Sequence, residues 1–217
     1  MKVLNTETED YHVHSINYSD GMCTIDEIVQ FAGKIGMKTI AICDHSQAAN
    51  DTDQFMKKNF RSAIKRWKNV HNKVNVIFGV EADLLNKQGD ICAHIQGIEG
   101  TFIILSYHDT VYHGNLKSVV EGFINAIRRF HKQISFIGHI CWGLDESDVK
   151  RIILEANKFH VPLELNAKYY LQYPESWDVL LKNADQVYIN SDAHNLYDLK
   201  TLQKEARALL KKKKYIK

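Results

Sequence analysis

The chain lacks long apolar runs. No stretch of its 217 residues approaches the ~18 consecutive apolar residues of a membrane span, and residues 1–10 carry acids instead of an apolar leader. The sequence therefore predicts a cytoplasmic protein that does not cross a membrane. There are only two prolines and no low-complexity tract, so nothing indicates disorder. A formal net charge of +2 gives no general electrostatic reason to expect an acidic membrane or a nucleic acid as partner.

Cysteines are also few. Cys23, Cys43, Cys92 and Cys141 lie far apart, form no CxxC pair and are too few for a disulfide framework. We interpret them as small buried thiols. Cys141 is the one candidate for another role, because it follows His139 closely.

What the chain does contain is an alternation of helical and strand patterns. Thr24 and Glu27 form a capping-box pattern, so we expect a helix to start there and to stop near Gly36. Further amphipathic stretches predict helices over 54–71, with Phe55 on its apolar side, and over 116–130, 147–159 and 176–183. Short apolar runs predict seven strands, at 11–14, 39–43, 74–80, 101–106, 134–138, 161–165 and 187–190.

Strands that alternate with helices form parallel βαβ units, and barrels of that kind reach this length as one domain. We therefore expect residues 1–217 to form a single α/β domain. A His, Asp or Glu follows or occupies six of the seven predicted strands at its carboxyl end. Because the carboxyl ends of parallel strands share one rim, these side chains are expected to converge in one pocket.

A pocket crowded with imidazoles and carboxylates needs cations to balance the buried acids. His12 and His14, two apart on an extended segment, point to one side and can reach one ion. Mixed nitrogen and oxygen ligands suit Zn, Mn or Fe, and a shared carboxylate can bridge two ions. Such clusters supply hydroxide at neutral pH and stabilise the oxygens of a displacement at phosphorus.

The ordered set of motifs resembles one known superfamily. It comprises His12-x-His14, Ser19-Asp20-Gly21, Asp44-His45-Ser46, Gly79-Val80-Glu81, Ser106-Tyr107-His108, Gly138-His139, Glu164-Leu165-Asn166 and Ser191-Asp192-Ala193-His194. The chain is similar, over nearly its whole length, to the polymerase and histidinol phosphatase (PHP) superfamily. The resemblance implies a distorted (β/α)7 TIM-like barrel that holds two or three divalent metal ions.

The resemblance also implies a set of ligands. His12, His14, Glu81 and Asp192 would bind the first ion. Glu81, as a bridge, would bind the second together with His108 and His139. Asp20, His45 and His194 would bind the third, although some members have His where this chain has Asp20. We expect Glu81, His108 and His194 to be catalytic.

Several other polar residues have more than one possible role. Asp44 is either a partner that orients a liganding histidine or a turn residue, and Glu164 is interpreted as a buried support for the site. Asn166, Lys168 and His113 are candidates to bind substrate, with Lys168 on a phosphate and His113 as a proton donor, although the favoured interpretation of His113 is a loop residue. Arg128 and Arg129 fit a solvated helix face better than a phosphate site, and Lys211–Lys214 fits a solvated helix end. The remaining histidines are read as structural or surface residues: His71, His94, His131 and His160.

The leading hypothesis is a metal-dependent phosphoesterase that hydrolyses small phosphate monoesters, of which histidinol phosphate is one candidate. A 3′–5′ exonuclease is the alternative, because the segments around His45 and Glu81 resemble PHP domains of family X DNA polymerases. Trp142, Tyr169 and Tyr170 are then candidates to stack on a base. A noncatalytic metal-binding module is a third reading. Loss of ligands would be its usual mark, and all nine positions hold competent ligands.

Overall fold

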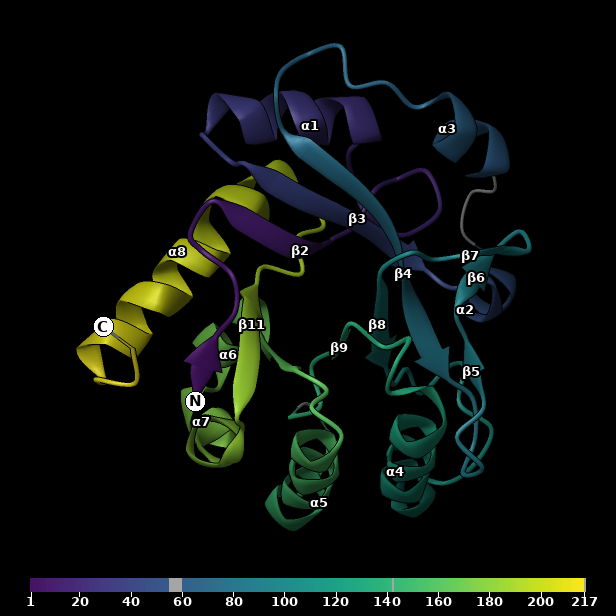
Figure 1. Cartoon of the computed structure of the whole chain (residues 1–217), viewed down its shortest axis with the longest axis vertical. Coiled ribbons are helices and arrows are strands. Elements are labelled where there is room, and N and C mark those ends of the chain that lie inside the picture. The colour runs from purple at the N-terminus through teal and green to yellow at the C-terminus, as the bar shows by residue number, and fades with distance from the viewer. Residues whose placement is uncertain (55–59, 142, 217) are drawn as a thin grey trace.

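A computed structural model describes residues 1–54, 60–141 and 143–216 of the chain, without the side chains of 61–63. Figure 1 shows a curled sheet with helices packed on its outside. The strands of the main sheet are β1 (Lys2–Val3), β2 (Glu9–Val13), β3 (Thr39–His45), β4 (Asn75–Leu84), β5 (Ile91–Cys92), β8 (Ile103–Ser106), β9 (Phe136–Ile137), β10 (Leu163–Asn166) and β11 (Gln186–Asn190). A separate small hairpin pairs β6 (His94–Ile95) with β7 (Ile98–Glu99).

The main sheet is parallel except at one short strand. Its order is β1-β11-β10-β9-β8-β4-β3-β2, and β5 pairs antiparallel with the end of β4. The two sides of the curl meet where Val13, at the end of β2, bridges Ala193, just after β11. This arrangement confirms the distorted barrel and all seven expected strands. It adds β1, which the sequence pattern did not predict.

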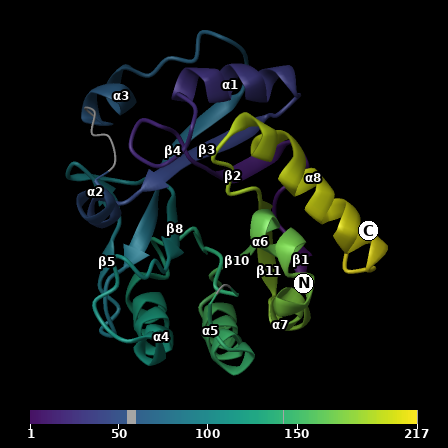
Figure 2. The same cartoon turned by 180° about the vertical axis from the view of Figure 1, so that it is seen from behind.

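The helices cover the outer face of the sheet (Figures 1 and 2). They are α1 (Ile25–Lys34), α2 (Gln47–Asp53), α3 (Phe60–Arg66), α4 (Val119–Phe130), α5 (Glu146–Lys158), α6 (Ala167–Gln172), α7 (Asp178–Asn183) and α8 (Leu196–Lys212), with short 3₁₀ turns η1 (Leu116–Ser118) and η2 (Pro174–Trp177). Among the described residues, none of these helices has the length and apolar character needed to span a bilayer.

Local sequence signals explain several boundaries. Thr24 caps α1, with both hydrogen bonds of the capping box formed, and Gly36 follows its end with a φ of +84°. The helix expected over 54–71 is too long at both ends: Gln54 is not helical, the described helix within the range is α3, and residues 67–71 form the loop after it. The sequence pattern did not predict α2, which Ser46 caps and which ends where Gln54 adopts a left-handed φ of 57°. Phe55 lies outside the described residues.

Aromatic side chains fill the barrel interior beneath the histidines. Tyr11 stacks on Phe102 with 5.4 Å between ring centroids, and Phe136 lies 5.1 Å from Tyr188. The ring of His12 lies 6.5 Å from that of Phe136. The polar rim therefore stands on a packed aromatic layer, which keeps its buried side chains in fixed positions.

All four cysteines are free thiols; Cys43, Cys92 and Cys141 are buried as expected, whereas Cys23 is only partly buried. Cys141 is buried, and burial raises the pKa of its thiol. It lies in none of the groups of potential metal ligands among the described residues.

Candidate metal centre at the carboxyl ends of the strands

The structure brings all nine predicted ligands to one rim of the barrel. Each comes from a strand end or from the segment directly after one, so the parallel direction of the strands delivers them together. They are His12, His14 and Asp20 from β2 and its loop, His45 from β3, Glu81 from β4, His108 after β8, His139 after β9, and Asp192 and His194 after β11.

The carboxylate of Glu81 lies at the centre of this rim. It is 1% exposed, and five imidazoles surround it. Its Oε1 lies 2.8 Å from His139 Nε2, 3.4 Å from His12 Nε2 and 3.6 Å from His108 Nε2. Its Oε2 lies 3.1 Å from His45 Nδ1 and 3.4 Å from His14 Nε2. One carboxylate therefore faces five imidazole nitrogens from four different segments of the chain.

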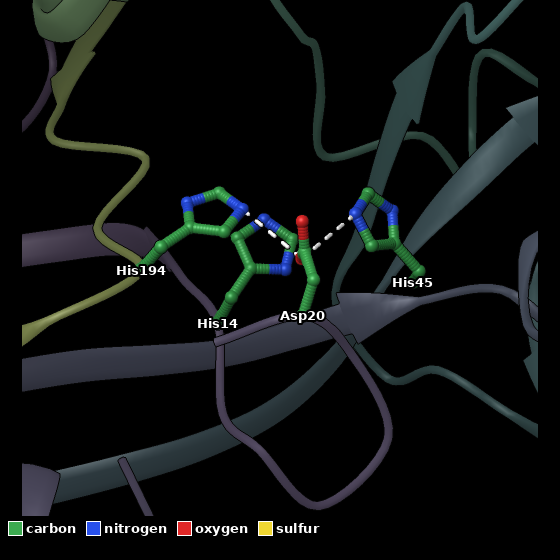
Figure 3. Close-up of side chains that lie close together, drawn as sticks. All are labelled: His14, Asp20, His45 and His194. Atoms are coloured by element: carbon green, nitrogen blue, oxygen red, sulfur yellow. Dashed lines mark ion pairs between the residues drawn. The ribbon is translucent and has the colours of Figure 1, made fainter. Parts of the chain in front are cut away.

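Two aspartates complete the rim. The Oδ1 of Asp192 lies 3.3 Å from His14 Nε2 and 3.7 Å from His12 Nε2. Figure 3 shows Asp20 between His194 and His45, whose Nε2 atoms lie 3.2 and 3.4 Å from its Oδ1. Asp20 is the exposed member of the cluster, whereas Asp192 is buried.

The backbone is strained at two of these positions. His139 has a φ of 24° and Asp192 a φ of 54°, values in the left-handed region that side-chain-bearing residues rarely adopt. The surrounding hydrogen bonds hold these conformations: the N–H of His139 donates to Glu164, and the Nδ2 of Asn166 donates to Asp192. Such strain is characteristic of functional sites, where it aims a side chain that a relaxed backbone would turn away.

Four histidines are oriented by partners on their Nδ1 side. The Nδ1–H groups of His12, His14, His108 and His194 donate to Glu164 Oε1 (2.8 Å), Ser19 Oγ (2.9 Å), Asp83 Oδ1 (2.6 Å) and the Asp192 carbonyl (2.9 Å), respectively. This leaves each Nε2 lone pair directed into the cluster. Metal-binding histidines in proteins are oriented in this way.

Sequence reasoning missed the roles of Asp83 and Ser19. Asp83 is buried and also accepts from Ser46 Oγ at 2.5 Å, and Ser19 donates to Asp20 at 3.0 Å. The spacing of Glu81 and Asp83 was the available signal, since residues two apart on a strand share a face. Glu164 is the buried support that the sequence predicted, because its two oxygens also accept from Asn190 and from the His139 N–H.

Asp44 has neither of the two expected roles. It lies within β3, is buried, and accepts from both the N–H and the hydroxyl of Ser15 at 2.6 Å. It therefore anchors the start of the loop that carries Asp20, instead of orienting a histidine or forming a turn.

The imidazoles of the rim differ in the direction in which their surroundings shift the pKa. Burial opposes charge on His12, but Glu164, Glu81 and Asp192 hold its pKa well above the usual value. Burial and the neighbouring His194 lower the pKa of His14 to about 3, so this ring is neutral. Burial would raise the pKa of Glu81, but His12, His108 and His45 hold it well below its usual value. The Glu81 carboxylate is thus ionised and demands positive charge from its surroundings.

Cations fit this set of donors. The Nε2 atoms of His12 and His14 are buried and accept or donate no hydrogen bond among the described residues. Three groups of side chains offer ligand atoms within 4.8 Å of one another: His14, Asp20, His45 and His194; His12, His14 and Glu81; His45, Glu81 and His108. Orphaned imidazole nitrogens beside ionised carboxylates are what a site for divalent transition metals provides.

The cluster opens into a cleft of about 530 Å³. Its walls include Tyr107, Asp109, Lys168 and Tyr169, and the Lys168 ammonium lies 5.4 Å from the centre of the Tyr169 ring. Lys168 is therefore placed where the sequence predicted a substrate contact.

Two other predicted substrate residues are not in the cleft wall. Asn166 is fully buried: its amide donates to Glu164 and Asp192, and its oxygen caps α6 by accepting from the Tyr169 N–H. His113 is exposed on a segment that bridges to Asn86. These positions make Asn166 a support of the site. They make His113 a loop residue and not a proton donor at the cleft.

Several expected surface features are confirmed. Arg128 and Arg129 pair with Glu155 and Asp90 on the helix exterior, and Lys211 and Lys213 pair with Glu7 and Glu175. Of the aromatics proposed to stack on a base, Tyr169 lines the cleft, Tyr170 is fully buried, and Trp142 lies outside the described residues.

A parallel barrel whose rim gathers histidines and acids suitable for several cations defines a class of metal-dependent proteins. The PHP domain model matches residues 10–211, and the chain belongs to this family. This finding bears out the resemblance seen in the sequence.

Curated relatives with related sequences are known. The chain is 26% identical over 164 residues to a "Probable phosphatase" of Shewanella piezotolerans and 27% identical over 164 residues to "Probable phosphatase YcdX" of Shigella flexneri. These matches cover 75% of this chain but only 64% and 65% of the relatives, so the chain spans just under two-thirds of their length.

A solved structure has the same fold. Histidinol phosphate phosphatase from Lactococcus lactis, complexed with Zn, L-histidinol and phosphate, aligns over 92% of this chain and 94% of its own with a TM-score of 0.53. The two sequences are 13% identical, so this likeness establishes the barrel.

Proposed function

We propose that the chain is a metal-dependent phosphatase that hydrolyses small phosphate monoesters. The observation that carries this proposal is the buried Glu81 carboxylate with five imidazole nitrogens 2.8–3.6 Å from its oxygens. No arrangement of protons on those rings gives all five a favourable contact with two oxygens. Divalent cations between the imidazoles and the carboxylate would give all five nitrogens a favourable contact.

The proposed ions are two or three of Zn, Mn or Fe. His12, His14, Glu81 and Asp192 would hold the first, and Glu81, His108 and His139 the second. Asp20, His45 and His194 would hold the third, and this group is supported by its mutual proximity together with His14. When bound, such ions polarise phosphoryl oxygens and lower the pKa of coordinated water.

The chain's own residues would bind and orient the substrate. Lys168, at the cleft wall, would donate to the oxygens of the phosphate. Glu81 fixes the spacing of the ligand groups around it, and His108 and His194 are the partly exposed histidines at the mouth, with side chains 23% and 19% exposed. We therefore assign Glu81, His108 and His194 as the residues on which turnover depends most.

Two observations support a small substrate. The cleft of about 530 Å³ falls within the range of small-molecule sites, ~300–1,000 Å³. The relatives are named "Probable phosphatase", and the Lactococcus lactis enzyme is complexed with Zn, L-histidinol and phosphate. Histidinol phosphate is accordingly the first substrate to test.

The test is a panel of phosphate monoesters, including histidinol phosphate, and single-stranded oligonucleotides, assayed after reconstitution with Zn, Mn or Fe. We expect monoester turnover that a chelator abolishes and that Glu81→Gln reduces by at least about 100-fold. Glu99→Gln, the same change at an exposed glutamate, is the control and should retain full activity.

Three results would contradict the proposal. Turnover of oligonucleotides without monoesters would make the chain a nuclease. Metal binding without turnover of either substrate class would make it a noncatalytic module. Robust activity in Glu81→Gln would remove Glu81 from its central role.

A further inference from the structure

The positive charge of the chain is concentrated in two segments, of which residues 200–217 carry eight Lys and Arg and one Glu, and residues 54–80 carry no acid at all. Residues 54–80 contain seven Lys and Arg and no Asp or Glu, which leaves 21 basic residues against 26 acidic residues in the rest of the chain. The near-zero total charge therefore conceals a strongly basic segment on a chain that is otherwise net negative. The seven basic residues of this segment all precede β4, in the connection from β3 that contains α3 and the loop after it.

The loop after α3 is held in place by two asparagines. The Nδ2 of Asn69 donates to Asn72 Oδ1 and to the Val74 carbonyl, while its Oδ1 accepts from the His71 N–H. Asn72 in turn donates to the Val29 carbonyl of α1 at 2.8 Å. The loop is therefore fixed against α1, and it holds the side chains of Lys68 and Lys73 out to solvent.

Close packing brings a second pair of lysines to this surface. A Cβ on Gly33 of α1 would lie 2.3 Å from Asn72 Nδ2, so only glycine permits this approach of loop and helix. Lys34 follows directly, and the carbonyl of Lys38 accepts from the Asn75 N–H. Both lysine side chains are exposed. Figures 1 and 2 show α3 and its loop on the same side of the sheet as α1.

We call this surface the basic face and define it by Lys34, Lys38, Lys65, Arg66, Lys68 and Lys73. All six are exposed, and none has an ion pair within the described parts of the chain. Some basic residues elsewhere do pair with acids, as Arg129 does with Asp90 and Lys211 with Glu7. The acidic neighbour at the edge of the face is Asp26, which lies 3.4 Å from His71.

We propose that the basic face binds the phosphodiester backbone of a nucleic acid without sequence preference. Closely spaced, unpaired Lys and Arg residues are what backbone phosphates attract. The described aromatics of the segment are engaged elsewhere: Phe60 is buried against Tyr18, and Trp67 packs on Phe78. Within the described residues, the face thus offers charge without a stacking platform.

A membrane surface fits this face less well than a nucleic acid. Val70, 81% exposed, is the large apolar side chain that the loop presents, and insertion into a bilayer takes several such residues. The inference is independent of the proposed phosphatase, because none of its residues belongs to the metal centre.

The test compares two variants with the same change in net charge. The first replaces Lys65, Arg66, Lys68 and Lys73 with Ala. The control replaces Lys132, Lys200, Lys204 and Lys212, four exposed lysines outside the face, with Ala. Circular dichroism checks the folding of both, and phosphatase activity should be unchanged in both. Binding to a labelled single-stranded oligonucleotide is measured by anisotropy over a series of salt concentrations, with anionic lipid vesicles as competitor.

The wild-type affinity should fall about 50-fold between 50 and 200 mM salt, as expected for four neutralised phosphates. The first variant should bind at least about tenfold more weakly at low salt and with much less salt dependence, whereas the control should match the wild type. Equal loss in both variants, or no wild-type binding, would overturn the proposal. Displacement of the oligonucleotide by the vesicles would overturn it in favour of a membrane surface.

Discussion

Replacing Glu164 with Gln tests whether the support beneath the ligands matters as much as the ligands. Glu164 is fully buried: its Oε1 accepts from His12 Nδ1 and Asn190 Nδ2, and its Oε2 from the His139 N–H and Asn166 Nδ2. Glutamine has nearly the same shape, but in either orientation its NH₂ group faces two donors.

The magnitude follows from those contacts. Two buried donors lose their acceptor, at about 1–3 kcal/mol each in the free energy of unfolding. His12 also loses the charged partner that aims its Nε2, and loss of such a partner lowers metal affinity about 10–100-fold. Each tenfold step is about 1.4 kcal/mol in the free energy of metal binding.

The assay is a competition titration of Zn against a chromophoric chelator, run with a thermal melt of the metal-free protein. Glu205→Gln, at an exposed position, is the matched control. Zinc affinity within a factor of two of wild type, in a folded Glu164→Gln protein, would refute the idea that Glu164 orients His12.

Three further predictions concern the site and the scaffold. Carboxylates hold the pKa of His12 and His45 above the usual value despite burial, whereas metal binding needs neutral imidazoles, so metal affinity should fall as pH drops. Calorimetry in buffers of different ionisation enthalpy should detect protons released when the metal binds. Zero proton release would contradict this prediction. Asp83→Asn should reduce kcat/KM about 10–100-fold by weakening the hold on His108 Nδ1, and wild-type kinetics would show that the 2.6 Å contact is dispensable. Thr24→Ala removes the capping box of α1 and should cost about 1 kcal/mol, seen as a decrease in Tm of about 2–4 °C with unchanged metal affinity.

Most of the strand pattern could be predicted because β3, β8, β9 and β10 are short runs of mostly buried residues. The residues of β3 from Ile40 to His45 are all buried, so the sequence reads as one apolar run that ends in ligands. The convergence of the ligands at one rim could be predicted from the topology, because parallel strands place their carboxyl ends together however the sheet is tilted or curled.

The roles of individual polar residues were harder to predict. An aspartate near a histidine, such as Asp44, has several partners within reach, and only the fold shows that Ser15 is the one it contacts. Asn166 resembles a site residue in sequence, but its hydrogen bonds face inward. Asp83 was overlooked although it shares a strand face with Glu81.

Charge is a further case in which a global property misleads. The net charge of +2 averages over a basic segment and an acidic remainder, and so it says nothing about local surfaces. Likewise, apolar spacing predicted a helix over 54–71 that is longer than α3, and it missed α2, whose bounds are set by the N-cap at Ser46 and the left-handed Gln54.

The measurement that most directly tests the central claim is anomalous X-ray diffraction from crystals grown with Zn, collected on both sides of the zinc absorption edge. We predict at least two zinc peaks within coordination distance of the imidazoles around Glu81, and loss of at least one in Glu81→Gln crystals. Absence of zinc from this rim, or unchanged peaks in the variant, would contradict a metal centre organised by that carboxylate.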